Sequence, residues 1–425
     1  MNLPSSSCRE HVFEVVARCL EGGQGPGDVL ARMPALRGTA PSLRAEVVHW
    51  ARHVLGARLR LEHALGGALP PRAADRARAL TVAALVEAGV SAGPWSDGTP
   101  TREQLRAAVD DVADPLEGLA VRSAVPVWMA ARFQRAYGDA AGAVLAGLGE
   151  RPPRTLRCNA LVGQRAALRD ALGREGVQTS SGKWAQTAVH CMDEADVFAT
   201  AAYREGWFEQ QDEASQLAAE VVAPPPRGRV LDLCAGSGGK TLALAAALQN
   251  RGVVMAADVH AGRVGELRGR LARARADNVQ PHVITRADDA ELAAFAARSD
   301  RILVDAPCSG TGSWRRRPQA RTNVTAADLE EMLRTQRELL ARAAAWLQPG
   351  ARLVYATCSL LPEENERQVE WLLEGRPELQ RMRLAEILGS DVAAPISDAT
   401  GTYLKLRPDL HGCDGFFLAV LRRPR

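Results

Sequence analysis

The spacing of apolar residues divides the chain into regions of different structure. From residue 8 to about residue 119, apolar residues recur every three or four positions, with Gly and Pro between the runs. This spacing is typical of amphipathic helices and predicts helices over Arg9–Leu20, Ser42–Leu55 and Ala73–Ala88. No alternation typical of a strand interrupts the pattern. We therefore expect residues 1–120 to form an all-α domain.

The pattern is mixed between residues 121 and 222. It predicts a helix over Val127–Tyr137, a strand over Arg154–Asn159 and a helix over Gln164–Glu175. The sequence Ala-Pro-Pro-Pro-Arg-Gly at positions 223–228 then interrupts the chain as a linker does. We expect residues 121–222 to form a small α+β domain.

Strands and helices alternate regularly in residues 223–425. The predicted strands are Arg229–Leu233, Val253–Asp258, His282–Thr285, Arg301–Asp305, Arg352–Ala356 and Gly415–Leu421. The predicted helices are Thr241–Gln249, Arg263–Arg275, Ala327–Leu347 and Glu363–Leu373. Such alternation is typical of an α/β domain, in which helices cover both faces of a parallel sheet.

Composition places the chain among soluble globular proteins of two or three domains. It has 425 residues, of which 46% are hydrophobic and 24% are charged. No apolar run reaches the roughly 18 to 20 residues that cross a bilayer, and Met1–Arg9 does not resemble a signal peptide. We expect a cytoplasmic protein without a membrane partner, in which the eight cysteines are free thiols.

The charged residues are unusual in kind rather than in balance. The formal net charge is only +3, yet Lys and Arg together number 53 and Lys occurs only at Lys183, Lys240 and Lys405. A lysine retained in such an Arg-rich chain is a candidate for a specific role. His49 and His53 are spaced for one helix face but lack a third ligand nearby, so no metal site is expected.

A glycine-rich turn follows the first strand of the α/β region, at residues 234–241. A phosphate-binding P-loop would need Gly where Cys234 stands, and a dinucleotide fingerprint would need a different glycine spacing. The turn fits S-adenosylmethionine, which has no phosphate and needs a close backbone approach together with an acidic residue after the second strand.

Acidic residues at strand ends complete the predicted cofactor site. Asp258 ends the second strand and can accept both ribose hydroxyls, whereas Asp288 follows the third strand, either beside the adenine or as a helix cap. The residues expected at the cofactor are Cys234, Ala235, Gly236, Ser237, Gly238, Gly239, Lys240, Asp258, Asp288 and Asp305.

Two further strand ends carry cysteines. Cys308 follows Asp305-Ala306-Pro307, and Cys358 follows Thr357. Carboxyl ends of parallel strands meet at one edge of a sheet, so both thiols are expected at the cofactor crevice, although cysteine is also a common core filler. Methylation at C5 of a pyrimidine requires such chemistry, because a thiolate that adds to C6 makes C5 nucleophilic. Asp305 can steady charge at N3 of the base.

The motifs resemble those of the Nop/Sun family of RNA cytosine-5 methyltransferases. The segments that carry the resemblance are Cys234–Thr241, Asp305–Gly312, Tyr355–Ser359, Pro362–Asn365, Gly206–Phe208, Gln211–Gln216, Leu156–Asn159 and Asp414–Phe417. One departure is that Gly236 and Ser237 stand where the family commonly has Ala and Pro. Residues 1–120 look like the NusB-type domain of the bacterial Sun branch.

This resemblance implies the fold, the reaction and the partners. The fold would be a class I S-adenosylmethionine-dependent methyltransferase domain, Rossmann-like, at residues 223–425, preceded by two RNA-binding domains. Cys358 would be the nucleophile, Cys308 would assist release, and Lys240 and Asp305 would lie in the catalytic site. The branch favours 16S ribosomal RNA over transfer RNA as the substrate of a monomeric enzyme.

RNA contacts are expected next to the second cysteine motif. Trp314 could stack on a base, and the run Arg315, Arg316 and Arg317 could hold phosphates. Two other functions stay open, a non-catalytic RNA-binding assembly factor and a DNA cytosine methyltransferase. The DNA enzymes use the thiol of a Pro-Cys pair and a Glu-Asn-Val segment, which is missing here, so the RNA enzyme is favoured.

Overall fold

The computed structural model describes residues 6–36, 38–66, 69–90, 92 and 98–425. It divides into two compact units, residues 1–151 with 313–326, and residues 152–312 with 327–425. The division therefore falls at Arg151, whereas the sequence pattern suggested a boundary at residue 120. The helix over Val127–Tyr137 is present as predicted but belongs to the first unit. The expectation about Met1–Arg9 falls partly outside the described residues.

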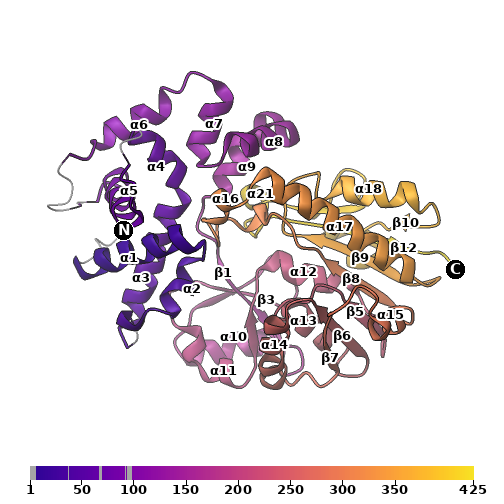
Figure 1. The fold of residues 1–425 in the computed structure, drawn as a ribbon. Helices are drawn as coiled ribbons and strands as arrows, with labels where there is room; N and C mark the ends of the chain where they lie inside the picture. The colour runs from indigo at the N-terminus through magenta and orange to yellow at the C-terminus, as the bar shows by residue number, and fades with distance from the viewer. Residues whose placement is uncertain (1–5, 37, 67–68, 91, 93–97) are drawn as a thin grey trace. The chain divides into compact units, whose positions relative to one another are not determined.

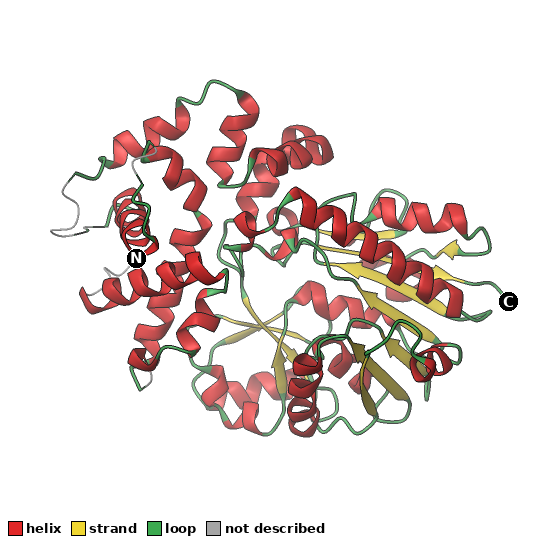
Figure 2. Cartoon of the chain, in the orientation of Figure 1, coloured by secondary structure: helices red, strands yellow, loops and turns green. Residues whose placement is uncertain are grey.

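The first unit is helical throughout its described residues, as expected (Figure 2). Its core joins α1, α3 and α5 through buried apolar side chains such as Val12, Trp50 and Leu80. These three helices confirm the predicted ones to within a few residues, whereas the NusB likeness stays a prediction. The helices are α1 (Ser6–Gly22), α2 (Pro26–Ala31), α3 (Pro41–Gly56), α4 (Arg58–Ala64), α5 (Ala73–Glu87), α6 (Arg102–Asp110), α7 (Pro115–Ser123), α8 (Val127–Tyr137), α9 (Ala141–Gly147) and α16 (Ala320–Asn323).

The second unit begins with a four-stranded antiparallel sheet in the order β2-β3-β1-β4. Only its first strand was predicted, because the other three have three or four residues, too few to show an alternating pattern. The elements are β1 (Arg154–Cys158), α10 (Arg165–Arg174), β2 (Thr179–Ser181), β3 (Ala188–Cys191), α11 (Ala201–Arg204) and β4 (Phe208–Gln210).

An eight-stranded sheet forms the rest of this unit. Strands β7, β6, β5, β8 and β9 are parallel, and β12 joins β9 antiparallel and pairs in turn with β10 and β11. The strands are β5 (Arg229–Asp232), β6 (Val253–Asp258), β7 (Val279–Val283), β8 (Arg301–Asp305), β9 (Arg352–Thr357), β10 (Gln380–Arg381), β11 (Tyr403–Leu406) and β12 (Phe416–Arg422). The third strand lies earlier than predicted because β7 is a partly exposed edge strand with a weak apolar signal.

Helices cover both faces of the large sheet, which confirms the predicted α/β architecture (Figure 1). One face packs on α12, α13 and α14 and the other on α15, α17 and α18. The helices are α12 (Glu213–Val222), α13 (Gly239–Ala247), α14 (Ala261–Ala274), α15 (Ala290–Ala296), α17 (Ala326–Trp346), α18 (Glu366–Gly375), α19 (Ala385–Leu388), α20 (Ser390–Ala393) and α21 (Pro408–His411).

The strand order reverses beside β5, which has β6 on one side and β8 on the other. Ligands of open α/β sheets bind outside the carboxyl ends of the strands at such a reversal. Every predicted cofactor and cysteine motif follows one of these strands. In the part of the chain that the structure describes, no helix is long and apolar enough to span a bilayer. All eight cysteines are described, and all are free thiols as expected.

Candidate active site

The glycine-rich turn connects β5 to α13 and defines one side of the site. Gly236 and Gly238 have φ angles of +56° and +86°, a region that favours glycine. A Cβ on Gly238 would lie 2.2 Å from Leu267 Cδ1 of α14, whereas nothing lies within 4 Å of the position for a Cβ on Gly236. The turn is therefore packed against α14 on one side and open to a ligand at Gly236.

Asp258 lies at the end of β6, beside this turn, as the sequence pattern predicts. The backbone N–H groups of Gly236 and His260 donate to its two carboxylate oxygens, each over 2.8 Å. These bonds fix the orientation of the carboxylate and leave it further lone pairs for a hydroxyl. The side chain is thus placed beside the open part of the turn.

Two more acidic residues differ in their surroundings. Asp232 is buried under the turn, where it accepts a 2.7 Å hydrogen bond from Thr241 Oγ1, and burial raises its pKa to about 7. Asp288 follows β7, and 74% of its side chain is exposed beside Arg286. The cap of α15 is Asp289, so the helix-cap alternative does not hold for Asp288.

Lys240 and Asp305 form an ion pair at the centre of the site. Lys240 Nζ donates to Asp305 Oδ2 over 2.7 Å, and it lies 5.3 Å from the centre of the Phe416 ring. Burial lowers the pKa of Lys240, but the Asp305 carboxylate outweighs this effect and raises it above the ordinary value. Lys240 therefore remains an ammonium group at physiological pH.

The two cysteines of the strand-end motifs lie together. Cys308 Sγ and Cys358 Sγ are 3.5 Å apart, because β8 and β9 are parallel neighbours. A hydrogen bond from the Cys308 thiol lowers the pKa of Cys358, opposed by burial and by the Asp305 carboxylate and helped by Lys240. The same pairing, together with burial, raises the pKa of Cys308. Cys358 is therefore the thiol that ionises first.

The buried carboxylate of Glu364 fixes the loops that carry the two cysteines. The carboxylate is fully buried and accepts hydrogen bonds from the Ser309 N–H (2.8 Å), Ser309 Oγ (2.5 Å) and Gln336 Nε2 (3.0 Å). Ser359 Oγ also donates to it. Burial raises the pKa of Glu364. The sequence motif contained this residue without revealing its role, because two of its donor residues, Ser309 and Gln336, lie in distant segments.

The structure corrects the expectation for Trp314. Only 1% of its surface is exposed, since its ring packs 5.9 Å from that of Phe133 inside the first unit. A buried ring cannot stack on an RNA base, so Trp314 is a core residue. Arg315 is also buried, which removes it from the expected phosphate contacts, whereas Arg316 is half-buried and Arg317 is exposed.

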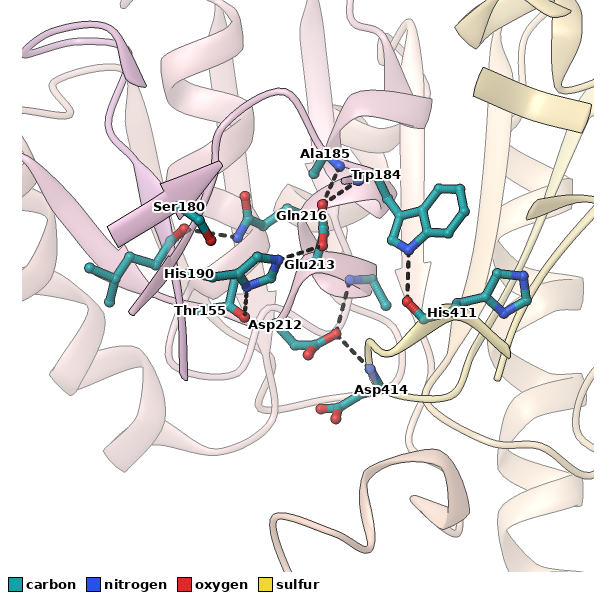
Figure 3. A network of polar contacts seen from close by, with 12 residues as sticks. Thr155, Ser180, Trp184, Ala185, His190, Asp212, Glu213, Gln216, His411 and Asp414 are labelled. Carbon is teal, nitrogen blue, oxygen red and sulfur yellow. Dashed lines mark hydrogen bonds and ion pairs between the residues drawn. The ribbon is translucent and has the colours of Figure 1, made fainter. Parts of the chain in front are cut away.

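The lead-in segment around Asp212 joins the small sheet to the last strand (Figure 3). Asp212 Oδ1 accepts hydrogen bonds from the backbone N–H groups of Ala214 and Asp414, over 2.9 and 3.1 Å. His190 Nε2 lies 3.2 Å from Glu213 Oε2 in the same network. These motif residues therefore connect elements of the fold. Among the described residues, no cluster of three metal-binding side chains is found.

Comparisons with known proteins identify similar chains. The family model described as 16S rRNA methyltransferase RsmB/F matches residues 219–422, and the RsmF/B-like ferredoxin-like domain matches residues 125–197. The probable ribosomal RNA small subunit methyltransferase B of Bacillus subtilis is 31% identical over 320 residues, which are 74% of this chain and 70% of that protein.

Two further similarities concern the chemistry and the fold. The human 28S rRNA (cytosine(4447)-C(5))-methyltransferase is 33% identical over 286 residues, which cover 64% of this chain and 34% of that protein. The crystal structure of a protein called PH0851 covers 99% of this chain and 100% of its own, with 23% identity and a TM-score of 0.82. That structure shares the fold along nearly the whole chain.

Proposed function

Because the chain belongs to the RsmB/F family of 16S ribosomal RNA methyltransferases, we propose that it methylates C5 of a cytosine in 16S ribosomal RNA. Membership of this family confirms the resemblance that the motifs predicted. The observation that carries the proposal is the thiol pair, Cys308 and Cys358, 3.5 Å apart at the edge of the sheet that holds the glycine turn and the Lys240–Asp305 ion pair.

The cofactor is S-adenosylmethionine, and the residues of the turn fit it. Gly236 leaves the backbone open to a ligand, and the fixed Asp258 carboxylate can accept from ribose hydroxyls. Asp288, in the loop that follows β7, is proposed to lie beside the adenine. When bound, the cofactor supplies an electrophilic methyl group on a sulfonium ion. The protein then has to activate the cytosine.

Cys358 begins the reaction as a thiolate. Its sulfur adds to C6 of the cytosine, which breaks the C5–C6 double bond and makes C5 nucleophilic. The Lys240–Asp305 pair is proposed to face the N3 side of the base, where negative charge develops. The lowered pKa of Cys358 increases the fraction of thiolate available at neutral pH.

Cys308 is proposed to act in the second half of the reaction. The Cys358 partner and burial are what raise its pKa in the free enzyme. Once Cys358 is bonded to C6 it is a neutral thioether, so the influence of its charge on Cys308 disappears. Cys308 can then lose its own proton to solvent. As a thiolate it can take the C5 proton after C5 has accepted the methyl group, and the C5–C6 double bond then forms again while Cys358 leaves as a thiolate.

The substrate assignment within RNA rests on the family. The target cytosine has to be unstacked to reach two thiols at a sheet edge, so a single-stranded or flipped base is expected. The all-α and ferredoxin-like regions are proposed to bind this RNA, with the protein acting as a monomer in the cytoplasm. Methylation of transfer RNA, or an assembly role without catalysis, are the alternatives that the test separates.

Methyl transfer from radiolabelled S-adenosylmethionine tests the proposal. Small subunits from a strain that lacks the gene should gain label and show a new 5-methylcytosine by bisulfite sequencing, whereas Cys358→Ala should transfer none. Asp258→Ala should bind the cofactor at least about tenfold more weakly, because a hydrogen bond to a charged acceptor contributes about 1.5–3 kcal/mol. Label in transfer RNA alone, or in no RNA, would contradict the proposal.

A further inference from the structure

Arg157 points at the glycine turn instead of at solvent. It lies in β1 of the small sheet and is only 4% exposed. Its Nη1 donates to Gln211 Oε1 over 2.5 Å and to the backbone carbonyl oxygen of Gly239. Arg157 belongs to the motif segment Leu156–Asn159, which has no role in the proposed reaction. Because Arg157 is buried, it does not contact RNA.

A second guanidinium reaches the same turn from another element. Arg270 of α14 donates through Nη1 to the carbonyl oxygen of Ser237 over 2.6 Å. Its Nη2 and Nε donate to Glu209 Oε2 over 2.8 and 3.3 Å. Leu267, one helical turn earlier, is the residue that packs against Gly238. One face of α14 therefore contacts two consecutive residues of the turn.

Glu209 links the two arginines. It is buried in β4 and lies opposite Arg157 in the pairing of β1 with β4. Its charge favours the cationic form of the buried Arg157, whose pKa burial lowers to about 10. The carboxylate thus holds Arg270 directly and stabilises Arg157 electrostatically, and both arginines donate to backbone carbonyls of the turn.

We propose that Arg157 and Arg270, held by Glu209, are positioning residues that fix the glycine turn in the shape that binds the cofactor. The small sheet is then part of the cofactor site. The inference rests on the proposed function, in which S-adenosylmethionine binds at this turn. A turn of glycines loses much conformational entropy when it binds a ligand, and charged hydrogen bonds to its carbonyls reduce that loss in advance.

Ser237 explains why this chain needs such support. The family commonly has proline there, whose ring restricts the backbone, and serine does not. The Arg270 contact is made mainly to the Ser237 backbone, since the distance to its carbonyl oxygen is 2.6 Å and that to its Oγ is 3.4 Å. Replacing the hydroxyl should therefore matter little, whereas removing the guanidinium should loosen the turn.

Arg273 provides a matched control on the same helix. Its Nη2 donates to Glu209 Oε1 over 2.5 Å, and its guanidinium lies 4.1 Å from the centre of the Tyr203 ring. Its guanidinium contacts Glu209, Phe208 and Tyr203, none of which is in the turn. Loss of Arg273 removes an ion pair of the same cluster but leaves the bond to the Ser237 carbonyl in place.

Calorimetry with S-adenosylhomocysteine tests the proposal on the full chain. Arg270→Met should weaken binding about tenfold, the loss expected for one charge-assisted hydrogen bond. Arg273→Met should stay within about twofold of the wild-type protein. In steady-state assays Arg270→Met should raise KM for the cofactor while leaving KM for RNA and kcat at saturation unchanged. Arg157→Lys should bind more weakly and partly retain the contact.

The outcomes separate this proposal from the proposed function. If Arg270→Met binds as tightly as wild type, or if Arg273→Met loses as much affinity, the cluster serves stability alone and the proposal is wrong. Thermal unfolding of each variant identifies a loss that comes from misfolding. If the wild-type protein does not bind S-adenosylhomocysteine, the proposed function fails first and this inference falls with it.

Discussion

The two loop regions that make the site are held in opposite ways. The cysteine loops, residues 306–312 and 358–365, are held from within by the buried Glu364 carboxylate and its hydrogen-bond donors. The glycine turn, residues 234–241, has its carbonyls bound from outside by Arg157 of the small sheet and Arg270 of α14. One region contains its own support, whereas the other depends on its neighbours.

This difference separates the two tasks of the site. The positions of Cys308 and Cys358 depend on donors that follow β8 and β9 and on Gln336 of α17, so they do not involve the small sheet. The glycine turn is contacted by Arg157 of the small sheet. Part of this sheet lies in the segment that the ferredoxin-like family model matches. Changes that act on one region should therefore leave the other intact.

The largest effect is expected from the thiols themselves. Cys358→Ala should abolish methyl transfer, because it removes the thiol proposed to add to C6. Cys308→Ala should still add and methylate but fail to lose the C5 proton, so it should accumulate as a protein–RNA complex. Denaturing gels with labelled RNA measure this complex, and calorimetry should show unchanged cofactor binding in both variants.

The double variant decides between the two thiols. Cys308→Ala combined with Cys358→Ala should form no complex, since the nucleophile is gone. If the Cys358→Ala protein instead traps RNA, the roles of the two cysteines are reversed, and the mechanism becomes that of the DNA enzymes with a Pro-Cys nucleophile.

A smaller effect is expected when the internal support is removed. Glu364→Ala removes the buried acceptor of the Ser309 N–H, of the Ser309 and Ser359 hydroxyls and of the Gln336 amide. Each unsatisfied group costs about 1–3 kcal/mol, so the free energy of unfolding should fall by about 3 kcal/mol. Urea denaturation measures this loss, and methyl transfer should fall with it.

The comparison with Arg270→Met makes this result informative. Glu364→Ala should leave the affinity for S-adenosylhomocysteine nearly unchanged where the protein is folded, whereas Arg270→Met should lower that affinity and preserve the thiols. If both variants lose cofactor affinity to the same extent, the two regions are not held independently.

The sequence predicted one kind of structure well and another poorly. Long periodic elements such as the helix Val127–Tyr137 and the strand Arg301–Asp305 match the structure residue for residue, because burial imposes a clear apolar pattern. The glycine turn, Asp258 and the two cysteines lie together as predicted, because the carboxyl ends of parallel strands meet at one edge of the large sheet. Short strands such as β2 and β4, with three residues each, leave no pattern to detect.

Residues whose role depends on long-range contacts were missed or misassigned. Glu364 and Arg157 belong to motif segments, but the sequence does not indicate what either residue does. Arg270 is in no motif. The partners of all three residues lie far away in the sequence. Trp314 was assigned to RNA because it precedes a run of arginines, yet its ring is buried against Phe133. Local sequence shows chemistry and periodicity but does not show which side chains meet.

The pH dependence of thiol reactivity should shift within the cysteine loops alone. The hydrogen bond from Cys308 lowers the pKa of Cys358, so Cys358 becomes a thiolate at a lower pH than a free cysteine. Cys308→Ala removes this donor, and the onset of Cys358 alkylation by iodoacetamide should move to higher pH. Cys308→Ser keeps a donor and should shift it less. An unchanged profile would show that Cys308 does not stabilise the thiolate.

The smallest effect is expected for a charge that lies outside both regions. Arg317 is exposed, so Arg317→Ala should remove at most one phosphate contact. Filter binding should then show RNA affinity a few-fold weaker, with the slope of log K against log salt lower by about one, as counterion release predicts. Trp314→Ala should behave differently, destabilising the first unit without changing the salt slope.

Cofactor affinity and the trapped complex should be unaffected by Arg317→Ala, because the glycine turn and the thiols are held by residues that it does not touch. A change in cofactor affinity or in the trapped complex would mean that bound RNA also influences the glycine turn or the thiols.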